Sequence, residues 1–189
     1  VTASLRTLLR SWHQFYNGYD PLFSWWTGAP YRSADSALVN YQRVLREKID
    51  SRFNMLASDV LALVGEFQHG SELHRMTHGV HSAALCDAKK ILTFADDIGR
   101  HNAIDKIVGR CILTDVPAEN HGLIFSGRVS SEMLLKAARR GFPVVISVAS
   151  PTNVAVRMAN DMGMTVVGMV RGQRMNIYSG DWRIVTDEG

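Results

Sequence analysis

Apolar residues recur at helical spacing in two stretches near the start of the chain. Residues 5–15, LRTLLRSWHQF, form an amphipathic pattern, and residues 33–49 repeat apolar side chains every three to four positions, which is the period of an α-helix. Ser33 or Asp35 is suited to cap the start of the second helix. The repeating positions of that helix are Leu38, Tyr41, Leu45 and Ile49.

The segment between them, residues 16–31, is expected to form an aromatic loop. It holds Trp25 and Trp26 beside glycine and proline, which interrupt helices. Aromatic side chains in such a setting most often attach helices to a neighbouring surface, so we assign the region no chemistry. We interpret residues 1–54 as a helical N-terminal extension and residues 55–189 as a separate domain.

From residue 58 onward, strand-like and helix-like patterns alternate. Apolar runs typical of strands lie at residues 79–87, 91–97, 122–126, 143–150, 165–172 and 174–180. Helical periodicity lies at residues 58–67, 101–113, 129–141 and 153–163, with Ser58 as the expected cap of the first helix. Near-continuous apolar strands between helices predict a largely parallel sheet covered on both faces. The fold class is therefore α/β.

Polar residues gather where the predicted strands end and helices or turns begin. In open α/β sheets ligands bind beyond the carboxyl ends of the strands. Helix N-termini there offer free N–H groups, and guanidinium groups bind phosphate through paired hydrogen bonds. We therefore expect a site for a pyrophosphate-bearing ligand. The residues at these positions are Arg100, His101, Arg128, Ser150, Arg171 and Arg174.

The stretch DDIGRHNAIDK, residues 96–106, shows this arrangement most densely. Gly99 permits a turn before a helix, and we expect Asp97 to orient Arg100 or His101. Each polar residue also has a simpler interpretation. Ser150 or Thr152 can cap a helix, and Glu132 can pair with Arg128 on the surface. The chain contains neither a Walker loop nor a G-x-G-x-x-G fingerprint, which argues against a nucleoside triphosphatase or a common dinucleotide enzyme.

Composition describes an ordinary globular protein that suits an anionic small ligand. The 189 residues carry a formal charge of +3 and a pI near 9.0, which is too weakly basic to indicate nucleic acid. No apolar tract is long enough for a transmembrane helix, and the start lacks the pattern of a secretory signal. Two cysteines outside a Cys-x-x-Cys pair suggest a reduced, cytoplasmic protein.

Metal and thiol chemistry find little support in the residue pattern. His78 and His81 are three apart, so on a strand they would face opposite ways, and the zinc deaminase signature is missing. We expect no metal site. Cys111 lies on an apolar helical stripe, where a thiol is inert. Cys86 is the better but still weak candidate for a catalytic thiol, because it lies near the histidines in the sequence.

Five ordered motifs resemble the FdhD family of formate dehydrogenase accessory proteins, which are regarded as sulfurtransferases. The resemblance covers about residues 55–185, and the motifs are THGVHSAAL, DDIGRHNAIDKIVG, SGRVSSEMLLKAA, SPTNVAV and VVGMVRGQRMNIY. It implies a three-layer α/β/α sandwich similar to the cytidine deaminase fold.

The resemblance also implies a ligand and partners. Family members carry sulfur from a cysteine desulfurase to molybdenum bis(molybdopterin guanine dinucleotide), the cofactor of formate dehydrogenase, and generally act as homodimers. A guanine nucleotide is the simplest mimic of this ligand. The family's cofactor-binding stretch corresponds to Met169, Val170, Arg171, Gly172, Gln173 and Arg174.

This sequence departs from the family pattern at four points. The family's persulfide-bearing cysteine lies in a Cys-Gly-x-Cys-Gly loop upstream of THGVH, whereas this chain has no cysteine before Cys86. Residues 1–50 look helical where the family is β-rich. His78 replaces a usual glycine and Asp96 a usual glutamate. Three hypotheses stay open: a sulfurtransferase, a non-catalytic cofactor-binding or chaperone module, and an unrelated nucleotide-binding enzyme on the same fold.

Overall fold

The computed structural model describes residues 2–19, 21–49 and 52–186. The chain forms two compact units, Val1–Glu47 and Lys48–Gly189, and each is described by itself. The boundary between the two units therefore lies after residue 47, seven residues before the boundary expected between residues 54 and 55. The first and last residues of the two expected regions, Val1 and Gly189, lie outside the described residues.

The first unit is built from two helices, α1 (Thr2–Tyr16) and α2 (Pro21–Ile49). The first predicted helix is confirmed, but the expected loop is wrong, because α2 already begins at Pro21 and includes Pro30. Aromatic packing between the helices explains the difference. The rings of Trp12 and Phe23 meet edge-on with centroids 5.3 Å apart, and those of His13 and Tyr31 stack at 4.0 Å. Such packing overrides the local preference of glycine and proline.

The expected caps of the second helix are also wrong, because both residues lie inside α2. Asp35 instead accepts two hydrogen bonds from the guanidinium of Arg6 on α1, at 2.6 and 2.9 Å. The carboxylate therefore joins the two helices and does not begin one.

The second unit follows the predicted alternation of strands and helices closely. Its helices are α3 (Ala57–His69), α4 (Glu72–Thr77), α5 (Arg100–Leu113), α6 (Ser131–Arg140) and α7 (Asn153–Met162), with short 3-10 turns at Ala118–Asn120 and Asp181–Arg183. Its strands are β1 (Met55–Leu56), β2 (His81–Cys86), β3 (Ile91–Asp97), β4 (Gly122–Phe125), β5 (Val144–Ser147), β6 (Thr165–Arg171), β7 (Arg174–Ser179) and β8 (Ile184–Val185). The cap expected at Ser58 is wrong, since Leu56 is the residue that precedes α3.

Six of these strands form one sheet in the order β3-β2-β4-β5-β6-β7. Strands β4, β5 and β6 are parallel, while β2, β3 and β7 run antiparallel to their neighbours. The expected largely parallel sheet is thus parallel only at its centre. Short connections explain this, because a turn of a few residues joins only antiparallel strands, whereas a parallel pair needs a long crossover.

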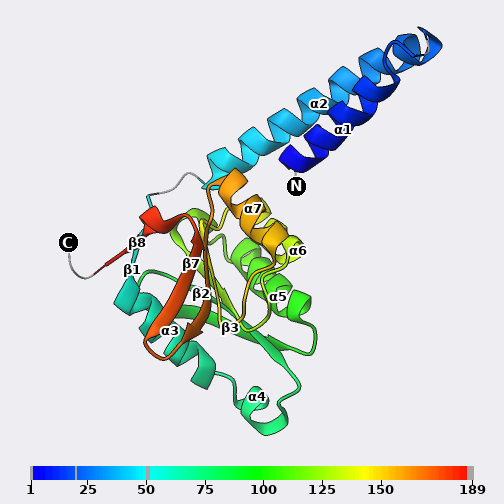
Figure 1. The fold of residues 1–189 in the computed structure, drawn as a ribbon. Helices are drawn as coiled ribbons and strands as arrows, with labels where there is room; N and C mark the ends of the chain where they lie inside the picture. The colour runs from blue at the N-terminus through cyan, green and yellow to red at the C-terminus, as the bar shows by residue number, and fades with distance from the viewer. Residues whose placement is uncertain (1, 20, 50–51, 187–189) are drawn as a thin grey trace. The chain divides into compact units, whose positions relative to one another are not determined.

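Helices cover both faces of the sheet, as Figure 1 shows, so the α/β class with three layers is confirmed. On one face α3 packs Val60, Leu63 and Phe67 against strand residues that include Ala84 and Ile124. On the other face lie α5, α6 and α7. Alternate strand residues point to opposite faces, and both sets are buried in the central strands. This double burial holds the strand ends in fixed positions.

Candidate functional site

The expected strand ends meet at one edge of the sheet. His81, which begins β2, pairs with Asp97, which ends β3, and Arg171 at the end of β6 pairs with Arg174 at the start of β7. Because β4, β5 and β6 are parallel, their carboxyl ends lie at this same edge. Six strands at a spacing of about 4.8 Å make the edge about 24 Å long. We call this line of strand ends and loops the carboxyl edge.

Arg100 and Arg128 lie in adjoining segments of the carboxyl edge. Arg100 is the first residue of α5, and its side chain packs over the loop that follows β4. A Cβ added to Gly127 would lie 3.4 Å from both Cβ and Cδ of Arg100. Arg128 is exposed in that loop. Gly127 therefore lets the two guanidinium-bearing segments approach each other closely.

His101 lies beside the start of α6, where it has an acidic neighbour. Its Nε2 atom is 3.6 Å from Oε2 of Glu132, which is the second residue of α6. The expected pairing of Glu132 with Arg128 is therefore not the one that the structure gives. The first residues of α5 and α6 are neighbours, so their free N–H groups open toward the same stretch of the edge.

Hydrogen bonds tie the loop after β4 to the loop after β5. The buried Ser147 hydroxyl donates to the carbonyl of Gly127 at 2.7 Å, and the N–H of Thr152 donates to the carbonyl of Val129 at 2.9 Å. Val129 and Pro151 also form an isolated parallel bridge. These contacts fix the two loops side by side.

The caps of α6 and α7 are Ser130 and Thr152. The Thr152 hydroxyl accepts from the N–H of Ala155 at 3.2 Å, and Ser130 accepts from Met133 at 3.4 Å. Ser150 is exposed and lies outside the cap. Its hydroxyl thus remains a candidate for the ligand, as expected from its place at a strand end.

The stretch from Met169 to Arg174 forms the end of β6, a tight turn and the start of β7. Met169 and Gly172 have positive φ angles of 56° and 55°, and the N–H of Met169 donates to the carbonyl of Ala149 at 3.2 Å. This bond joins the hairpin to the loop after β5. Gly172 permits the turn because glycine has no Cβ to clash at positive φ.

Most of the hairpin is open to solvent, with one exception among the predicted residues. Arg171, Gly172, Gln173 and Arg174 are exposed, whereas the side chain of Val170 is 1% exposed and belongs to the core under α3. Val170 therefore supports the hairpin from below and is not open to a ligand. The two arginines are direct cross-strand partners, and like charges in this position repel unless an anion lies near them.

Close approach of the backbone is built into the base of the hairpin. A Cβ on Gly168 would lie 3.0 Å from the carbonyl oxygen of Ala149, 3.1 Å from the ring of Tyr178 and 3.2 Å from Pro151. A side chain at this position would press on the loop after β5, so glycine lets β6 lie close against that loop. The sequence pattern alone does not single out Gly168.

Asp97 has a different role from the one expected. Its carboxylate accepts from the N–H of Gly99 at 2.9 Å and from the amide of Asn102 at 3.1 Å, and it pairs with Lys106 at 2.7 Å. It does not orient Arg100 or His101. The hydrogen bond from Lys106, then those from Gly99 and Asn102, lower the pKa of Asp97 from its ordinary 3.8 to about 2. Asp97 thus fixes the turn into α5.

Asp96 anchors the segment that carries the histidines. Its carboxylate accepts hydrogen bonds from the hydroxyls of Ser71, at 2.8 Å, and Ser82, at 2.6 Å. Both serines are buried. Between these two serines, helix α4 ends at Thr77, and the next residue, His78, has a φ angle of 50°. This left-handed conformation favours glycine, so His78 is held in a position that costs a side-chain-bearing residue some strain.

His81 lies at the carboxyl edge beside the end of β4. Its Nδ1 atom is 3.4 Å from the hydroxyl of Ser126, and that hydroxyl also accepts from the N–H of Ser82 at 3.0 Å. Ser126 was missed from the sequence, although its place between a strand and a glycine was a usable signal. Lys106 had no such signal, because its partner lies nine residues away.

Neither cysteine lies at the carboxyl edge. Cys86 ends β2 opposite Gly122, the first residue of β4, so it lies at the far edge of the sheet from His81. Its thiol is fully buried, and burial raises its pKa to about 12. Burial also raises the pKa of Cys111 on α5. A thiol that stays protonated is a poor nucleophile. Cys86 is also separated from His81 by the length of β2, although the two residues are near each other in the sequence.

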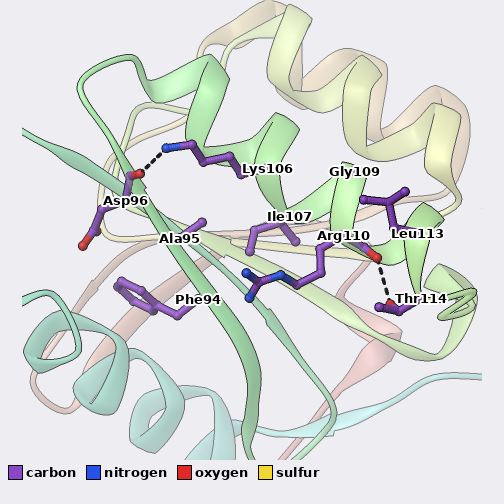
Figure 2. Close-up of a pocket in the computed structure, with 9 residues that line it drawn as sticks. All are labelled: Phe94, Ala95, Asp96, Lys106, Ile107, Gly109, Arg110, Leu113 and Thr114. Carbon is purple, nitrogen blue, oxygen red and sulfur yellow. Dashed lines mark hydrogen bonds between the residues drawn. The ribbon is translucent and has the colours of Figure 1, made fainter.

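Two hollows of the second unit adjoin α5. A groove of about 660 Å³ lies between β3 and α5 (Figure 2), and a smaller hollow of about 320 Å³ adjoins it. Across residues 2–19, 21–49 and 52–186, no group of three or more His, Cys, Asp and Glu side chains is placed to hold a metal ion. The carboxyl edge is instead an open surface with positive charge, which suits an extended anion better than a small apolar ligand.

Comparison with known proteins gives this arrangement a family. The FdhD/NarQ family matches residues 30–185. The chain is 47% identical over 133 residues to the sulfur carrier protein FdhD of Bacillus pumilus, covering 70% of this chain and 51% of the relative. It is 39% identical over 154 residues to the sulfur carrier protein FdhD of Listeria innocua, covering 82% of this chain and 57% of the relative.

A solved structure shows the same fold. The crystal structure of a protein assigned as a formate dehydrogenase accessory protein from Desulfotalea psychrophila matches with a TM-score of 0.68 and 31% identity, covering 71% of this chain and 61% of that one. The chain spans about half the length of the curated relatives named here. The matched region contains every residue predicted for the carboxyl edge, and on this evidence the chain belongs to the FdhD/NarQ family.

Proposed function

We propose that this chain binds the anionic guanine dinucleotide arms of molybdenum bis(molybdopterin guanine dinucleotide) and takes part in the sulfuration of that cofactor for formate dehydrogenase. The cofactor is cargo here, received and passed on. The carboxyl edge would hold its phosphates, and a cysteine desulfurase would supply the sulfur. The relatives' names, sulfur carrier protein and formate dehydrogenase accessory protein, support this role.

One observation carries the proposal. The loops after β4 and β5 are tied to each other and to the β6–β7 hairpin. As a result, four arginines from three segments lie on one edge, beside the N-termini of α5, α6 and α7. Guanidinium groups and helix N-termini both favour phosphate, and an edge of about 24 Å is long enough for more than one phosphate group. The four are Arg100, Arg128, Arg171 and Arg174.

The remaining parts of the proposal concern partners and place. The chain would work with a cysteine desulfurase and a formate dehydrogenase, as a homodimer in the cytoplasm. None of the helices in the described residues is long and apolar enough to cross a membrane. We propose no nucleic-acid partner.

A second function is favoured by the state of the thiols. Both cysteines of this chain are buried, and burial raises the pKa of each. In this second version the chain is a cofactor-holding or chaperone module, and its sulfur-carrying thiol is supplied by another segment or protein. The carboxyl edge keeps the same role.

Guanine-nucleotide binding tests the part that both versions share. Titration of guanosine diphosphate into the chain, followed by calorimetry, should give saturable binding that weakens at least about tenfold in Arg174→Ala, since a charge-assisted hydrogen bond contributes about 1.5–3 kcal/mol. Arg157→Ala, which changes an exposed arginine on the second turn of α7, is the matched control. Equal affinity in wild type and Arg174→Ala would contradict the assignment of the hairpin.

Mass spectrometry separates the two versions. The chain is incubated with a cysteine desulfurase and cysteine, and its intact mass is compared before and after reduction. A reducible gain of one sulfur atom, lost in Cys86→Ala or Cys111→Ala, would show that this chain carries sulfur itself. No gain of sulfur would leave the non-catalytic version.

A further inference from the structure

We propose that His74 and His78 form a two-histidine site for a divalent transition-metal ion of the kind that imidazole ligands suit, such as Ni²⁺, Cu²⁺ or Zn²⁺. The site lies at the end of α4 and does not depend on the proposed cofactor binding. The expectation of no metal site rested on His78 and His81, whereas helical spacing pairs His78 with His74.

The two rings lie together where α4 ends, just before β2 (Figure 1). They are four residues apart in the sequence, a spacing that brings side chains together on a helix, and the N–H of His78 donates to the carbonyl of His74 at 2.8 Å. The ring centroids are 5.6 Å apart, with an angle of 86° between the ring planes. Both residues are exposed, so an ion can reach them.

This separation of the rings suits two imidazoles that bind one ion. With the ion about 2.1 Å from each ring nitrogen and in line with each ring centre, the centroids lie about 4.6 Å apart for ligands at a right angle and about 6.5 Å apart for opposite ligands. Ligands at a tetrahedral angle give about 5.3 Å. The observed 5.6 Å lies inside this range and close to the tetrahedral value.

A hydrogen bond sets the tautomer of His74. Its Nδ1 atom is 2.9 Å from the carbonyl oxygen of Val80, and because a carbonyl can only accept, Nδ1 carries the proton. The neutral ring then presents the lone pair of Nε2, which is the atom that would bind the ion. Histidines that bind metals usually donate their other ring N–H to such an acceptor, so His74 is already oriented as a ligand.

A buried side chain holds the backbone that carries His74. The N–H of His74 donates to the hydroxyl of Ser71 at 2.9 Å, and that hydroxyl donates to the carboxylate of Asp96 at 2.8 Å. Ser71 itself is buried. A ligand on a fixed backbone loses less conformational freedom on binding than one on a loose segment, so this anchoring favours ion binding.

His78 occupies a backbone conformation that is costly for a residue with a side chain. Its φ angle of 50° is favoured by glycine and tolerated by asparagine. Costs of this kind often persist at positions where function needs the residue. A shared ion would offset the cost, because the ring of His78 supplies the second ligand.

Water would complete the coordination of the ion. Within the part of the chain that the structure describes, no third His, Cys, Asp or Glu side chain joins the pair. The nearby carboxylate of Asp96 already accepts from two serine hydroxyls. A site with two protein ligands and open positions binds and releases its ion readily, in contrast to a closed structural site.

Nickel binding by the tag-free chain tests the pair. Titration calorimetry with Ni²⁺, in a buffer that does not bind metals, should show one saturable site. His74→Asn and His78→Asn should each weaken binding at least about tenfold, because the second of two linked ligands binds at a high effective concentration. Asparagine keeps a donor for Val80 at the first position and tolerates positive φ at the second. The double variant should bind little more weakly than either single variant, since either change already removes the pair.

His69→Asn is the matched control. His69 is exposed at the end of α3, and its Nδ1 atom also bonds to a carbonyl oxygen, that of Gly65, at 2.7 Å. This variant should bind Ni²⁺ as wild type does. Thermal melts without metal confirm that each variant is folded, and added Ni²⁺ should raise the melting temperature of wild type and His69→Asn only. A wild type without saturable binding would overturn the proposal, and so would equal affinity in wild type, His74→Asn and His78→Asn.

Discussion

Asp97 shows how one side chain sets the geometry of the carboxyl edge from the turn that precedes α5. Three donors converge on its carboxylate, from Gly99, Asn102 and Lys106. Together they hold the turn that begins α5, and this turn places Arg100 and His101. The residue therefore acts on the site through its neighbours.

The lowered pKa of Asp97 predicts acid sensitivity with a defined window. A carboxyl group whose pKa falls on folding stabilises the protein above its unfolded pKa of 3.8 and loses that contribution as the pH falls toward about 2, because the unfolded state then binds more protons. Asp97→Asn should lower the melting temperature at pH 7. It should also reduce the fall in melting temperature that wild type shows between pH 4 and pH 2. Thermal melts across this range measure both effects.

The partner Lys106 offers the matched control for this prediction. Lys106→Met removes the largest cause of the pKa shift and keeps most of the aliphatic stem of the side chain. Its pH profile should resemble that of Asp97→Asn. If both variants show the pH profile of wild type, the ion pair between Asp97 and Lys106 does not contribute to the pH dependence of stability.

The buried thiols predict slow reaction with alkylating reagents. Because the pKa of Cys86 is raised to about 12, almost none of it is thiolate at pH 8, and burial blocks access to both cysteines. Iodoacetamide at pH 8 should modify neither residue in the folded chain and both residues in denaturant, as intact mass will show. Rapid modification of Cys86 in the folded chain would restore it as a candidate nucleophile.

At the residue scale, the arginines of the carboxyl edge could be located from the sequence. The side-chain partners that fix the neighbouring residues Asp97 and His101 could not. Arg100 and Arg174 follow strands or turns, which is a pattern visible along the chain. The partners of Asp97 and His101 depend on contacts between segments, so Lys106 and Glu132 could not be assigned from spacing alone.

At the scale of elements, the carboxyl edge depends on how closely loops and strands approach. Apart from α4 and β8, which the sequence analysis did not predict, the strands and helices after residue 58 were predicted well, because buried strands are apolar throughout and helices repeat every three to four residues. Residues 21–31 were not, because packing between α1 and α2 decides their conformation. The antiparallel direction of the outer strands follows from their short turns, a signal that the apolar pattern does not contain.

Gly168→Ala tests the contact between β6 and the loop after β5. The added Cβ would lie 3.0 Å from the Ala149 carbonyl oxygen and 3.2 Å from Pro151, so the loop must shift. We expect weaker guanosine diphosphate binding and a loss of stability of about 1–3 kcal/mol, the usual cost of overpacking. Denaturant unfolding and calorimetry measure the two effects.

Gly65→Ala is the matched control within α3. Nothing lies within 4 Å of its added Cβ, so the change should stabilise the helix by about 0.5–1 kcal/mol and leave binding unaltered. If Gly168→Ala behaves like this control, the close approach has no role in the site.

At the scale of the whole molecule, the second unit combines a rigid sheet with one open basic edge. Each motif that carries the family resemblance includes residues at this edge, and the core behind it is closed by helices on both faces (Figure 1). The thiols lie in that core, away from the edge. In the proposed function, binding and sulfur carriage are thus separable, and binding is the property that the exposed residues would serve.

The central claim is that separate segments form one anion-binding edge, and guanosine diphosphate affinity at both of its ends tests it most directly. We predict that Arg100→Ala and Arg174→Ala each weaken binding by about tenfold or more, consistent with about 1.5–3 kcal/mol for a charge-assisted hydrogen bond, while Arg157→Ala leaves it unchanged. Affinity that is the same in wild type, Arg100→Ala and Arg174→Ala would contradict the account.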